Sequence, residues 1–450
     1  MASWKLIVED YGKIKSAEIE VAPFTLFVGD NNSGKSYMLA LLWGIENFGI
    51  TSLIGNRYVN MEEANVIKDW FCEQIDTAVE KKKFEVSIKE ISETIPRFLN
   101  ERLKKTKSNL VKRIFNSESV DIGKFEIHLE DLEQEFLKFE ILEDSNMLRI
   151  YFDDKKYYIL GGEIIEEQMY KDDKFIQWFL IESLYGFILD VDINESQKNN
   201  CVYLPAARTG FVLTKDIINK VGRKNTFNLS EEKETITPFI RPINQFLDIL
   251  GDLSVENIGS KKNLKLVADL EKQMTNGVVE ISSMPNKEVQ YVPIGHRKGI
   301  PLRLSSAVVT ELSPLILILK HKEEIKGFYY EEPEMCLHPQ LQNKMGMIMG
   351  RIVNSGIRMV ITTHSDIILQ HINNMIKLAN REDCEEICKK LGYGKIDLLS
   401  DSQVKVYQLR AKTIGKTEIE ELPCGKNGFV IPTFNDALDK IMEEAYEIQG

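Results

Sequence analysis

The chain has 450 residues, enough for one large α/β domain with a substantial insertion or for two domains of ordinary size. Hydrophobic residues make up 43% and charged residues 28%, which is the balance of a globular protein and excludes a disordered or collagen-like chain. The formal net charge of -12 argues against a generally basic nucleic-acid binder, so any contact with DNA is expected to be local.

The six cysteines show neither CxxC pairs nor the density of a secreted disulfide scaffold, which favours a reducing cytoplasm. Cys384 and Cys388 lie four apart in an expected helix, but no second Cys or His pair follows at zinc-site spacing, so we interpret them as ordinary thiols. The N-terminus lacks the basic start and long apolar stretch of a signal peptide, and the most apolar run, Leu312 to Leu319, is too short to cross a bilayer. A soluble cytoplasmic protein without membrane contact is predicted.

The chain begins with short strands. Apolar or alternating residues predict strands at 5–8, 17–21 and 24–28. A glycine-bearing loop at 29–36 follows, and the apolar stretch 37–48 predicts a helix. The order is therefore strand, loop and helix.

An inserted arm is predicted next. Apolar residues recur at helical spacing between 67 and 79, and a second, charged helix is expected at about 96–115. The arm is too short and too interrupted, by Pro96 among others, for a long coiled coil. Alternation at 125–129 and 148–152 predicts a small β-piece, and a helix at about 175–189 closes the insertion.

The main sheet is expected to resume at 201–204, before a helical section at about 215–274 and strands at 278–304. The predicted organisation is a discontinuous head interrupted by two insertions. Its parts are a first head segment at 1–55, the arm at 56–198, a head strand at 199–214, a second helical section at 215–275 and the C-terminal head segment at 276–450.

The loop at 29–36 matches the pattern G-x-x-x-x-G-K-[ST] in the required context, after a strand and before a helix. Glycines let backbone N–H groups curl around phosphate oxygens, the lysine reaches the outer phosphates, and the hydroxyl after it can ligate Mg²⁺. The pattern predicts an ATP and Mg²⁺ site formed by Gly29, Asn31, Asn32, Ser33, Gly34, Lys35 and Ser36. The alternative is a simple glycine-rich turn.

Two further strands end in polar residues. The apolar strand from Gly327 ends in Glu331 and Glu332, the arrangement needed to hold Mg²⁺ and to polarise an attacking water. By itself an apolar strand followed by solvated glutamates is common. The apolar strand 358–363 would deliver His364 to the same end of a parallel sheet, where it could touch the γ-phosphate. No other histidine receives a catalytic role.

Between the second helical section and the acidic strand lies the segment 301–307, followed by an apolar helix. Its serines, Ser305 and Ser306, could simply cap that helix.

Taken together and in this order, these motifs resemble the ABC-type ATPase heads of the SMC, RecF and overcoming-lysogenization-defect groups, and more closely the AAA-family ATP-binding proteins of bacterial anti-phage defence islands. The resemblance covers the head and not the insertions. It implies an α/β fold, an ABC-type P-loop ATPase head with a mixed sheet core and flanking helices, carrying a mainly helical insertion with a small β-piece.

The resemblance also implies roles for single residues. Lys35 and Ser36 would match the P-loop pair, and Glu331 the magnesium-side acid. Glu332 would be the catalytic acid and His364 the switch histidine. The segment Leu304–Ala307, here named the signature segment, would place Ser305 on the γ-phosphate bound by a partner head.

The sequence departs from the family pattern at three places. Glu331 stands where Asp is usual, Ser306-Ala307 replace two glycines, and Leu337-His338-Pro339 replaces the usual turn after the acids. The forms Glu331-Glu332-Pro333-Glu334 and Leu337-His338-Pro339 are familiar in the defence branch. Arg208, at the end of Tyr203-Leu204-Pro205-Ala206-Ala207-Arg208, is a candidate cation near the phosphates, with a surface arginine as the alternative. The glutamine of the Q-loop is not assignable; Gln168, Gln197 and Gln245 are among the possibilities.

The function implied is an ATPase that acts as a conformational switch within a homodimer or higher homo-oligomer with ATP bridging the heads. No acidic cluster typical of a Toprim nuclease follows His364, so we expect a separately encoded effector, a nuclease or another toxic protein. Two alternatives stay open. One is a RecF-like or SMC-like DNA-repair ATPase contacting DNA through Arg102, Lys104, Lys105, Lys107, Lys112 and Arg113, and the other is an ATP-gated scaffold with little turnover.

Overall fold

The structure is a computed structural model, and it describes residues 4–47, 62–142, 145–152, 157–179, 200–214, 239–282, 288–413, 415–432 and 442–448. The chain forms two units. Unit 1 comprises Met1–Glu20, Gly44–Arg113 and Ser117–Lys198, and unit 2 comprises Val21–Trp43, Ile114–Asn116 and Asn199–Gly450. Parts of two predicted helical stretches, 180–189 and 215–238, lie outside the described residues, as does Gln197.

Unit 1 contains two groups of strands. The strands β1 (Trp4–Tyr11), β2 (Ile14–Glu20) and β5 (Ile122–Leu129) run in the order β5-β1-β2 with antiparallel pairing. A separate antiparallel sheet has the order β4-β6-β7-β8, formed by Lys83–Ser87, Phe136–Leu142, Met147–Tyr151 and Tyr157–Leu160.

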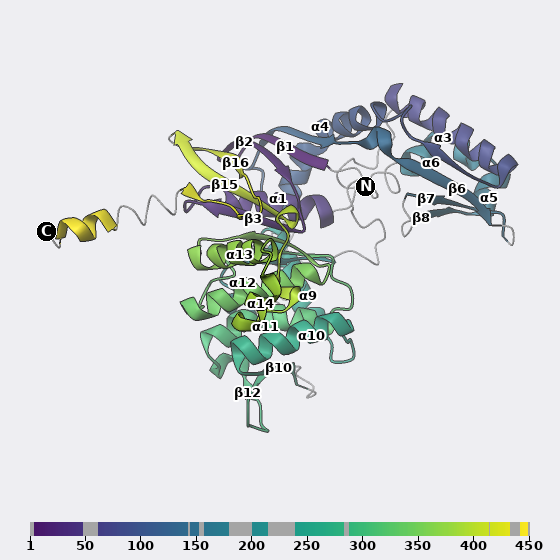
Figure 1. Cartoon of the computed structure of the whole chain (residues 1–450). Coiled ribbons are helices and arrows are strands. Elements are labelled where there is room, and N and C mark those ends of the chain that lie inside the picture. The colour runs from purple at the N-terminus through teal and green to yellow at the C-terminus, as the bar shows by residue number, and fades with distance from the viewer. Residues whose placement is uncertain are drawn as a thin grey trace, which may run out of the picture. The chain divides into compact units, whose positions relative to one another are not determined.

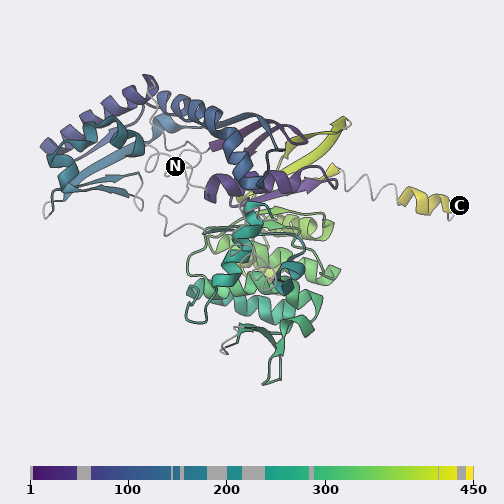
Figure 2. The same ribbon diagram turned by 180° about the vertical axis from the view of Figure 1, so that it is seen from behind.

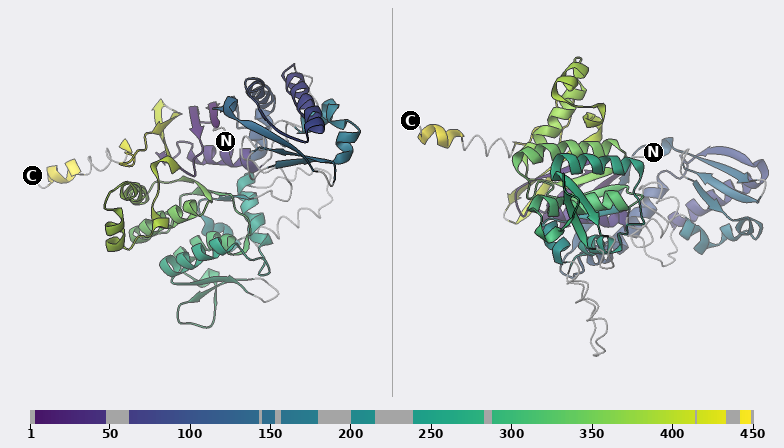
Figure 3. Two further views of the ribbon diagram at one scale, coloured as in Figure 1. Left: turned by 45° about the vertical axis from the view of Figure 1, so that its right-hand side comes forward. Right: turned by 90° about the horizontal axis from the view of Figure 1, so that it is seen from below.

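The helices of unit 1 include α3 (Glu62–Lys81), α5 (Gly162–Glu166), α6 (Asp173–Phe179) and most of α4 (Thr94–Phe115). In α3 the apolar residues fall on one buried face, including Ile67, Phe71 and Ile75, because they recur every three to four positions. Helices α3 and α6 pack together beside the four-stranded sheet (Figure 3). The inserted arm, predicted as mainly helical with a small β-piece, thus contains helices and a four-stranded sheet.

The strands of unit 2 follow the order β16-β15-β3-β14-β13-β9. Their bounds are Lys416–Leu422, Val404–Thr413, Phe24–Gly29, Arg358–Thr362, Gly327–Glu331 and Cys201–Leu204. All neighbours from β15 to β9 are parallel, and β15 and β16 form an antiparallel hairpin. Strand β3, purple in Figure 2, lies beside the yellow-green β15 although the two are far apart in the sequence. A small sheet, β10-β11-β12 (Gly277–Ile281, Val289–Pro293 and Ile300–Pro301), belongs to the same unit.

The helices of unit 2 begin with α1 (Lys35–Asn47), whose last residues pass into unit 1. Helices α10, α11, α12 and α13 are packed as neighbours (Figure 1). The remaining bounds are α9 Arg241–Asp252, α10 Lys261–Leu270, α11 Ala307–His321, α12 Pro339–Asn354, α13 Asp366–Ala379 and α14 Cys384–Leu391.

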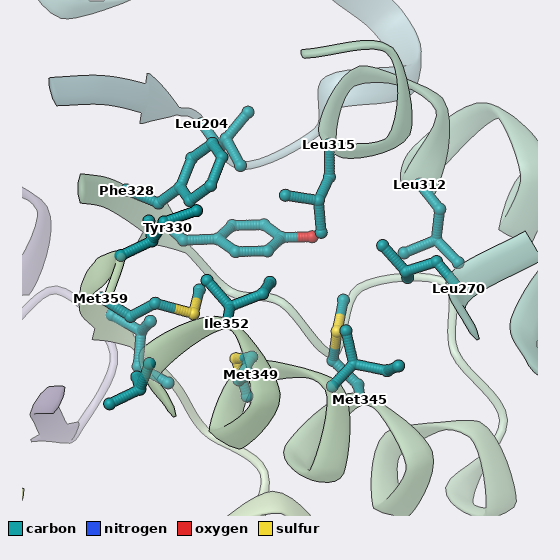
Figure 4. Close-up of a cluster of buried hydrophobic side chains, with 14 of the residues drawn as sticks. Leu204, Leu270, Leu312, Leu315, Phe328, Tyr330, Met345, Met349, Ile352 and Met359 are labelled. Carbon is teal, nitrogen blue, oxygen red and sulfur yellow. The ribbon is translucent and has the colours of Figure 1, made fainter. Parts of the chain in front are cut away.

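The core of unit 2 joins the parallel strands to these helices. In Figure 4, Tyr330 of β13 extends towards Leu315 of α11, and the side chains of α12 line the cluster on another side. All of these residues are completely or almost completely buried, so they hold the strand ends in fixed positions relative to α11 and α12. The labelled members are Leu204, Leu270, Leu312, Leu315, Phe328, Tyr330, Met345, Met349, Ile352 and Met359.

The predicted α/β fold, a mixed sheet core with flanking helices and an insertion that carries helices and strands, is confirmed for the described residues. The structure differs in two details. The two stretches predicted as one β-piece belong to different groups of strands, because β5 pairs with β1 whereas β7 pairs with β6 and β8. The first head segment was placed at 1–55, but Met1–Glu20 falls in unit 1.

Candidate functional site

Four strand ends meet at one edge of the parallel strands of unit 2. The register pairs Phe27 of β3 with Thr362 of β14, and Thr362 in turn with Glu331 of β13. Strand β9 continues the row, with Leu204 opposite Tyr330. Carboxyl ends of parallel strands are where ligands bind in open α/β sheets. The sheet therefore brings the P-loop, the two carboxylates and His364 to a common edge.

The P-loop has the backbone expected of an anion cradle. Gly29, Asn32 and Gly34 have positive φ angles of 136°, 59° and 102°. A Cβ atom on Gly29 would lie 2.3 Å from the backbone oxygen of Leu409 on β15, so only glycine fits there. Helix α1 begins at Lys35 directly after the loop, so its free N–H groups face the loop.

Lys35 is folded back over this loop. It is only 6% exposed, and its Nζ donates to the backbone oxygens of Gly29 at 3.0 Å and Asp30 at 2.7 Å. Burial lowers the pKa of Lys35 to about 8, although the nearby carboxylates of Glu332, Asp30 and Glu334 act in the opposite direction. The ammonium group is thus held in a site where an additional anion would stabilise its charge.

Glu331 and Glu332 end β13 in different ways. Glu331 is buried, and its carboxylate accepts hydrogen bonds from the Tyr203 hydroxyl at 2.7 Å and the Ala206 N–H at 2.8 Å. Glu332 is partly buried and has a left-handed backbone, with φ 42°. Its N–H donates to the Thr362 oxygen at 2.9 Å. Left-handed non-glycine residues are uncommon and cluster at functional sites, so the surroundings of Glu332 hold it in a costly conformation.

A third acid, Glu334, was missed by the sequence analysis. Its carboxylate accepts from the His364 N–H at 2.6 Å and from the Thr363 hydroxyl at 2.9 Å. Burial raises the pKa of Glu334, and the neighbouring Glu332 raises it further, whereas these hydrogen bonds lower it. The signal was present in the spacing Glu-Glu-Pro-Glu, but a surface glutamate was equally consistent with it.

His364 follows β14, and Glu334 fixes its backbone. Burial lowers the pKa of His364, and the positive charge of Lys35 lowers it further. Both effects favour the neutral imidazole, which can still donate one ring N–H to a phosphate oxygen.

Arg208 is not the surface residue that the sequence analysis considered as the alternative. Its side chain is 0% exposed, so the surface alternative is wrong. Its guanidinium donates to the backbone oxygens of Glu331 at 2.6 Å and Glu332 at 3.1 Å, and it forms an ion pair with Glu311. In this structure it binds the strand end that carries the acids, and contact with phosphates stays a prediction.

The signature segment lies at the amino end of α11. The Ser305 hydroxyl donates to the Leu302 oxygen at 2.6 Å. Ser306 occupies the cap position of α11, yet its side chain makes no capping hydrogen bond and is exposed. Helix capping therefore does not account for Ser306, and the amino end of α11 presents a hydroxyl and backbone N–H groups.

The residues of the P-loop fit a nucleoside triphosphate. The Ser33 hydroxyl is buried and has no hydrogen-bond partner among the described residues, and the buried Lys35 ammonium donates to two backbone oxygens of the loop. Among the described residues no group of three His, Cys, Asp or Glu side chains could hold a metal by itself. This is compatible with Mg²⁺, which is usually held by one or two side chains together with phosphates and water. The exposed Ser36 hydroxyl and the Glu331 carboxylate, which keeps free lone pairs, are the candidate ligands.

Other predicted features find structural explanations. Gln245 is a core residue of α9 that accepts from the Trp43 indole at 2.9 Å, and Gln168 lies in a turn of unit 1. Not all basic residues of α4 are available to a partner. Arg102 is buried, and Lys104 and Lys112 form ion pairs with glutamates of the same chain. None of the helices in the described part of the chain has the length and apolar character needed to span a bilayer.

A family model described as an AAA ATPase domain matches residues 1–369. The chain belongs to the AAA ATPase domain family. Within the matched range lie the P-loop, both acids and His364, so the site described above lies in the part that carries the family resemblance. No curated protein matches this AAA ATPase chain.

Solved structures similar to this AAA ATPase chain include three SMC heads. An SMC head bound to the C-terminal winged-helix domain of ScpA is 12% identical, with 93% of this chain and 96% of that chain covered and a TM-score of 0.37. The SMC head domain from Thermotoga maritima is 12% identical over 94% of this chain and 100% of that chain, with a TM-score of 0.36. The Pyrococcus furiosus SMC head with an extended coiled coil, bound to the C-terminal domain of ScpA, is 13% identical over 100% of both chains, with a TM-score of 0.37.

Proposed function

We propose that this AAA ATPase family member binds and hydrolyses Mg-ATP between two heads and uses the nucleotide as a conformational switch. The observation that carries the proposal is the strand register that brings the P-loop, Glu332 and His364 to one edge of the sheet. Each of these residue types has a task in phosphoryl transfer to water, and here they come from three separate parts of the sequence.

The residues of this chain divide the work. Backbone N–H groups of the loop and the start of α1 bind the phosphates, and Lys35 turns from the Gly29 and Asp30 oxygens to the outer phosphates. Mg²⁺, when bound through Ser36 and Glu331, neutralises charge on the phosphates. Glu332 accepts the proton of the attacking water, and neutral His364 donates a hydrogen bond to the γ-phosphate.

A second head completes the site in this proposal. The amino end of α11, with Ser305 and Ser306, would contact the γ-phosphate bound by the partner head. The exposed Ser306 hydroxyl and the open helix end support this assignment, because both favour an anion. ATP closes the pair only to the extent that it binds the closed form more tightly than the open form.

The test is Glu332→Gln, which keeps the shape of the side chain and removes its basicity. We expect Mg-ATP binding to persist, hydrolysis to fall by about 10²–10⁴-fold, and ATP-dependent dimers to accumulate. Phosphate release and light scattering measure the last two effects. Lys35→Ala should abolish binding, and Glu385→Gln, at an exposed site on α14, should change nothing. Hydrolysis by Glu332→Gln at the parent rate would refute the assignment.

The biological setting is a further part of the proposal and rests on the family resemblance alone. We infer a role in anti-phage defence, with control of a separately encoded effector such as a nuclease or toxin. Neighbouring genes provide the check, since a repair operon without an effector would contradict this role. The alternative of a DNA-repair ATPase predicts ATPase stimulation by DNA that weakens with salt.

A further inference from the structure

A buried charge pair connects the signature helix to the catalytic strand end. Arg208 and Glu311 have side chains that are 0% and 1% exposed, and their Nη2 and Oε1 atoms are 2.7 Å apart. Glu311 lies in α11, four residues after Ala307 and therefore on the same helix face. Its second oxygen accepts from the N–H of Thr209 at 3.0 Å and from the Thr209 hydroxyl at 2.7 Å.

The arginine end of the pair is equally constrained. The guanidinium donates to three backbone oxygens, those of Pro205 at 2.8 Å, Glu331 at 2.6 Å and Glu332 at 3.1 Å. It also lies over the Tyr330 ring, 4.6 Å from its centroid. Arg208 thus binds the carbonyl of the one residue in this strand end whose backbone is left-handed, Glu332.

Stability alone does not explain this pair. A buried ion pair gains little over well-packed apolar side chains, because both charges lose their hydration. What it does provide is directional geometry, since the planar guanidinium fixes several acceptors at once. Here the guanidinium hydrogen-bonds the backbone of the catalytic acid on one side and forms an ion pair with the helix of the signature segment on the other.

We propose that Arg208 and Glu311 are positioning residues that couple the signature segment of a head to the Glu332 of the same head. This inference rests on the proposed two-head function. In a closed pair, the signature segment of one head contacts the ATP of its partner, whereas its Glu332 acts on its own ATP. When the signature segment contacts the ATP of the partner head, a shift of α11 moves Glu311. Arg208, which is bound to both, then moves the Glu332 carbonyl. Closure of one ATP site thereby prepares the acid at the other.

The coupling has a kinetic consequence. Two ATP sites that activate one another give a sigmoidal dependence of hydrolysis on ATP concentration. Coupling between two binding sites typically changes a binding affinity by about 5–150-fold. In this proposal the Arg208 guanidinium stays bound to the strand end and to Glu311 and does not contact phosphate, so nucleotide binding to a single head is expected to be independent of the pair.

The decisive variant replaces both charges, Arg208→Met with Glu311→Leu, so that no unpaired charge stays buried. We expect it to fold, to bind Mg-ATP within about twofold of the parent, and to lose about 10–100-fold in kcat through displacement of Glu332. Its ATP dependence becomes hyperbolic. The matched control removes another ion pair at the far end of α11, Lys320→Met with Glu271→Leu, and keeps the sigmoidal curve.

Thermal unfolding, calorimetric ATP binding and steady-state phosphate release are measured on the full chain. A gentler variant, Thr209→Val, removes one hydrogen bond to Glu311 and should lower kcat and sigmoidality in the same direction. The coupling is refuted if the double variant retains the parent kcat and sigmoidal curve, if the parent curve is hyperbolic, or if the double variant unfolds while Thr209→Val behaves as the parent. A parent without ATPase activity would instead refute the proposed function.

Discussion

Lys35 makes ATP binding depend on pH in a way that follows from its burial. In the ligand-free protein the pKa of Lys35 is lowered to about 8, because the ammonium is removed from water. A bound triphosphate brings several negative charges to the same atom and raises this pKa again. Between pH 8 and the ordinary value of 10.5, the complex therefore keeps a proton that the free protein has lost.

The size of the effect follows from the fraction of charged Lys35 in the free protein. This fraction is about 0.9 at pH 7, about 0.5 at pH 8 and about 0.1 at pH 9. Binding should take up about half a proton at pH 8, and the Kd should rise about 10-fold from pH 7 to pH 9, or about 1.4 kcal/mol. The stability of the ligand-free protein responds to pH in the opposite direction. Between pH 8 and 10.5 the unfolded chain binds more protons at Lys35 than the folded one, so the free energy of unfolding rises with pH.

Isothermal titration calorimetry with a non-hydrolysable ATP analogue measures both quantities. Titrations in two buffers with different ionisation enthalpies give the number of protons taken up. Lys35→Arg is the informative variant, because its guanidinium stays charged and the uptake should disappear. Lys344→Arg, an exposed lysine that donates to the Gln273 oxygen, should behave as the parent. Proton uptake that is absent in the parent at pH 8, or that persists in Lys35→Arg, would show that the reasoning is wrong.

Four further substitutions, in two matched pairs, test the packing of the head by urea unfolding. Gly29→Ala should cost about 2–5 kcal/mol, because the added Cβ meets a β15 carbonyl at 2.3 Å in a left-handed conformation. Gly251→Ala in α9, where nothing lies within 4 Å of the added carbon, should instead stabilise by about 0.5–1 kcal/mol, and a loss would contradict the comparison. Asp397→Ala removes the buried partner of Arg351 and should cost about 3 kcal/mol, whereas Glu385→Ala in an exposed pair should stay within about 0.5 kcal/mol; equal costs would refute the role of burial.

The sequence predicted the elements that depend on local pattern. Strand β3, the P-loop and α1 follow from an apolar run, a spaced glycine-lysine motif and a second apolar run, and all three are confirmed. The strands that end in Glu331 and precede His364 were predicted in the same way, as was the helix after Ser306. Local patterns were sufficient to predict these elements, because the side-chain repeats of strands and helices extend over only two to four residues.

Long-range pairing was not predictable from one sequence. Strands β15 and β16 were not assigned, yet β15 lies directly beside β3. Likewise, an isolated acid such as Glu311 in an apolar helix does not indicate its partner, because the ion pair with Arg208 joins residues about a hundred positions apart. These features depend on which segments the fold brings together, and that information is spread over the whole chain.

The position of β3 also constrains how the protein is made. Its two neighbours, β14 and β15, begin at Arg358 and Val404, so the strand leading into the P-loop lacks both partners until most of the chain has left the ribosome. At roughly 5–20 residues per second this interval lasts some tens of seconds, during which a strand that is fully buried in the folded protein stays unpaired. Shortened chains that end before β15 should therefore be poorly soluble, and nascent chains of this protein are expected to depend on chaperones.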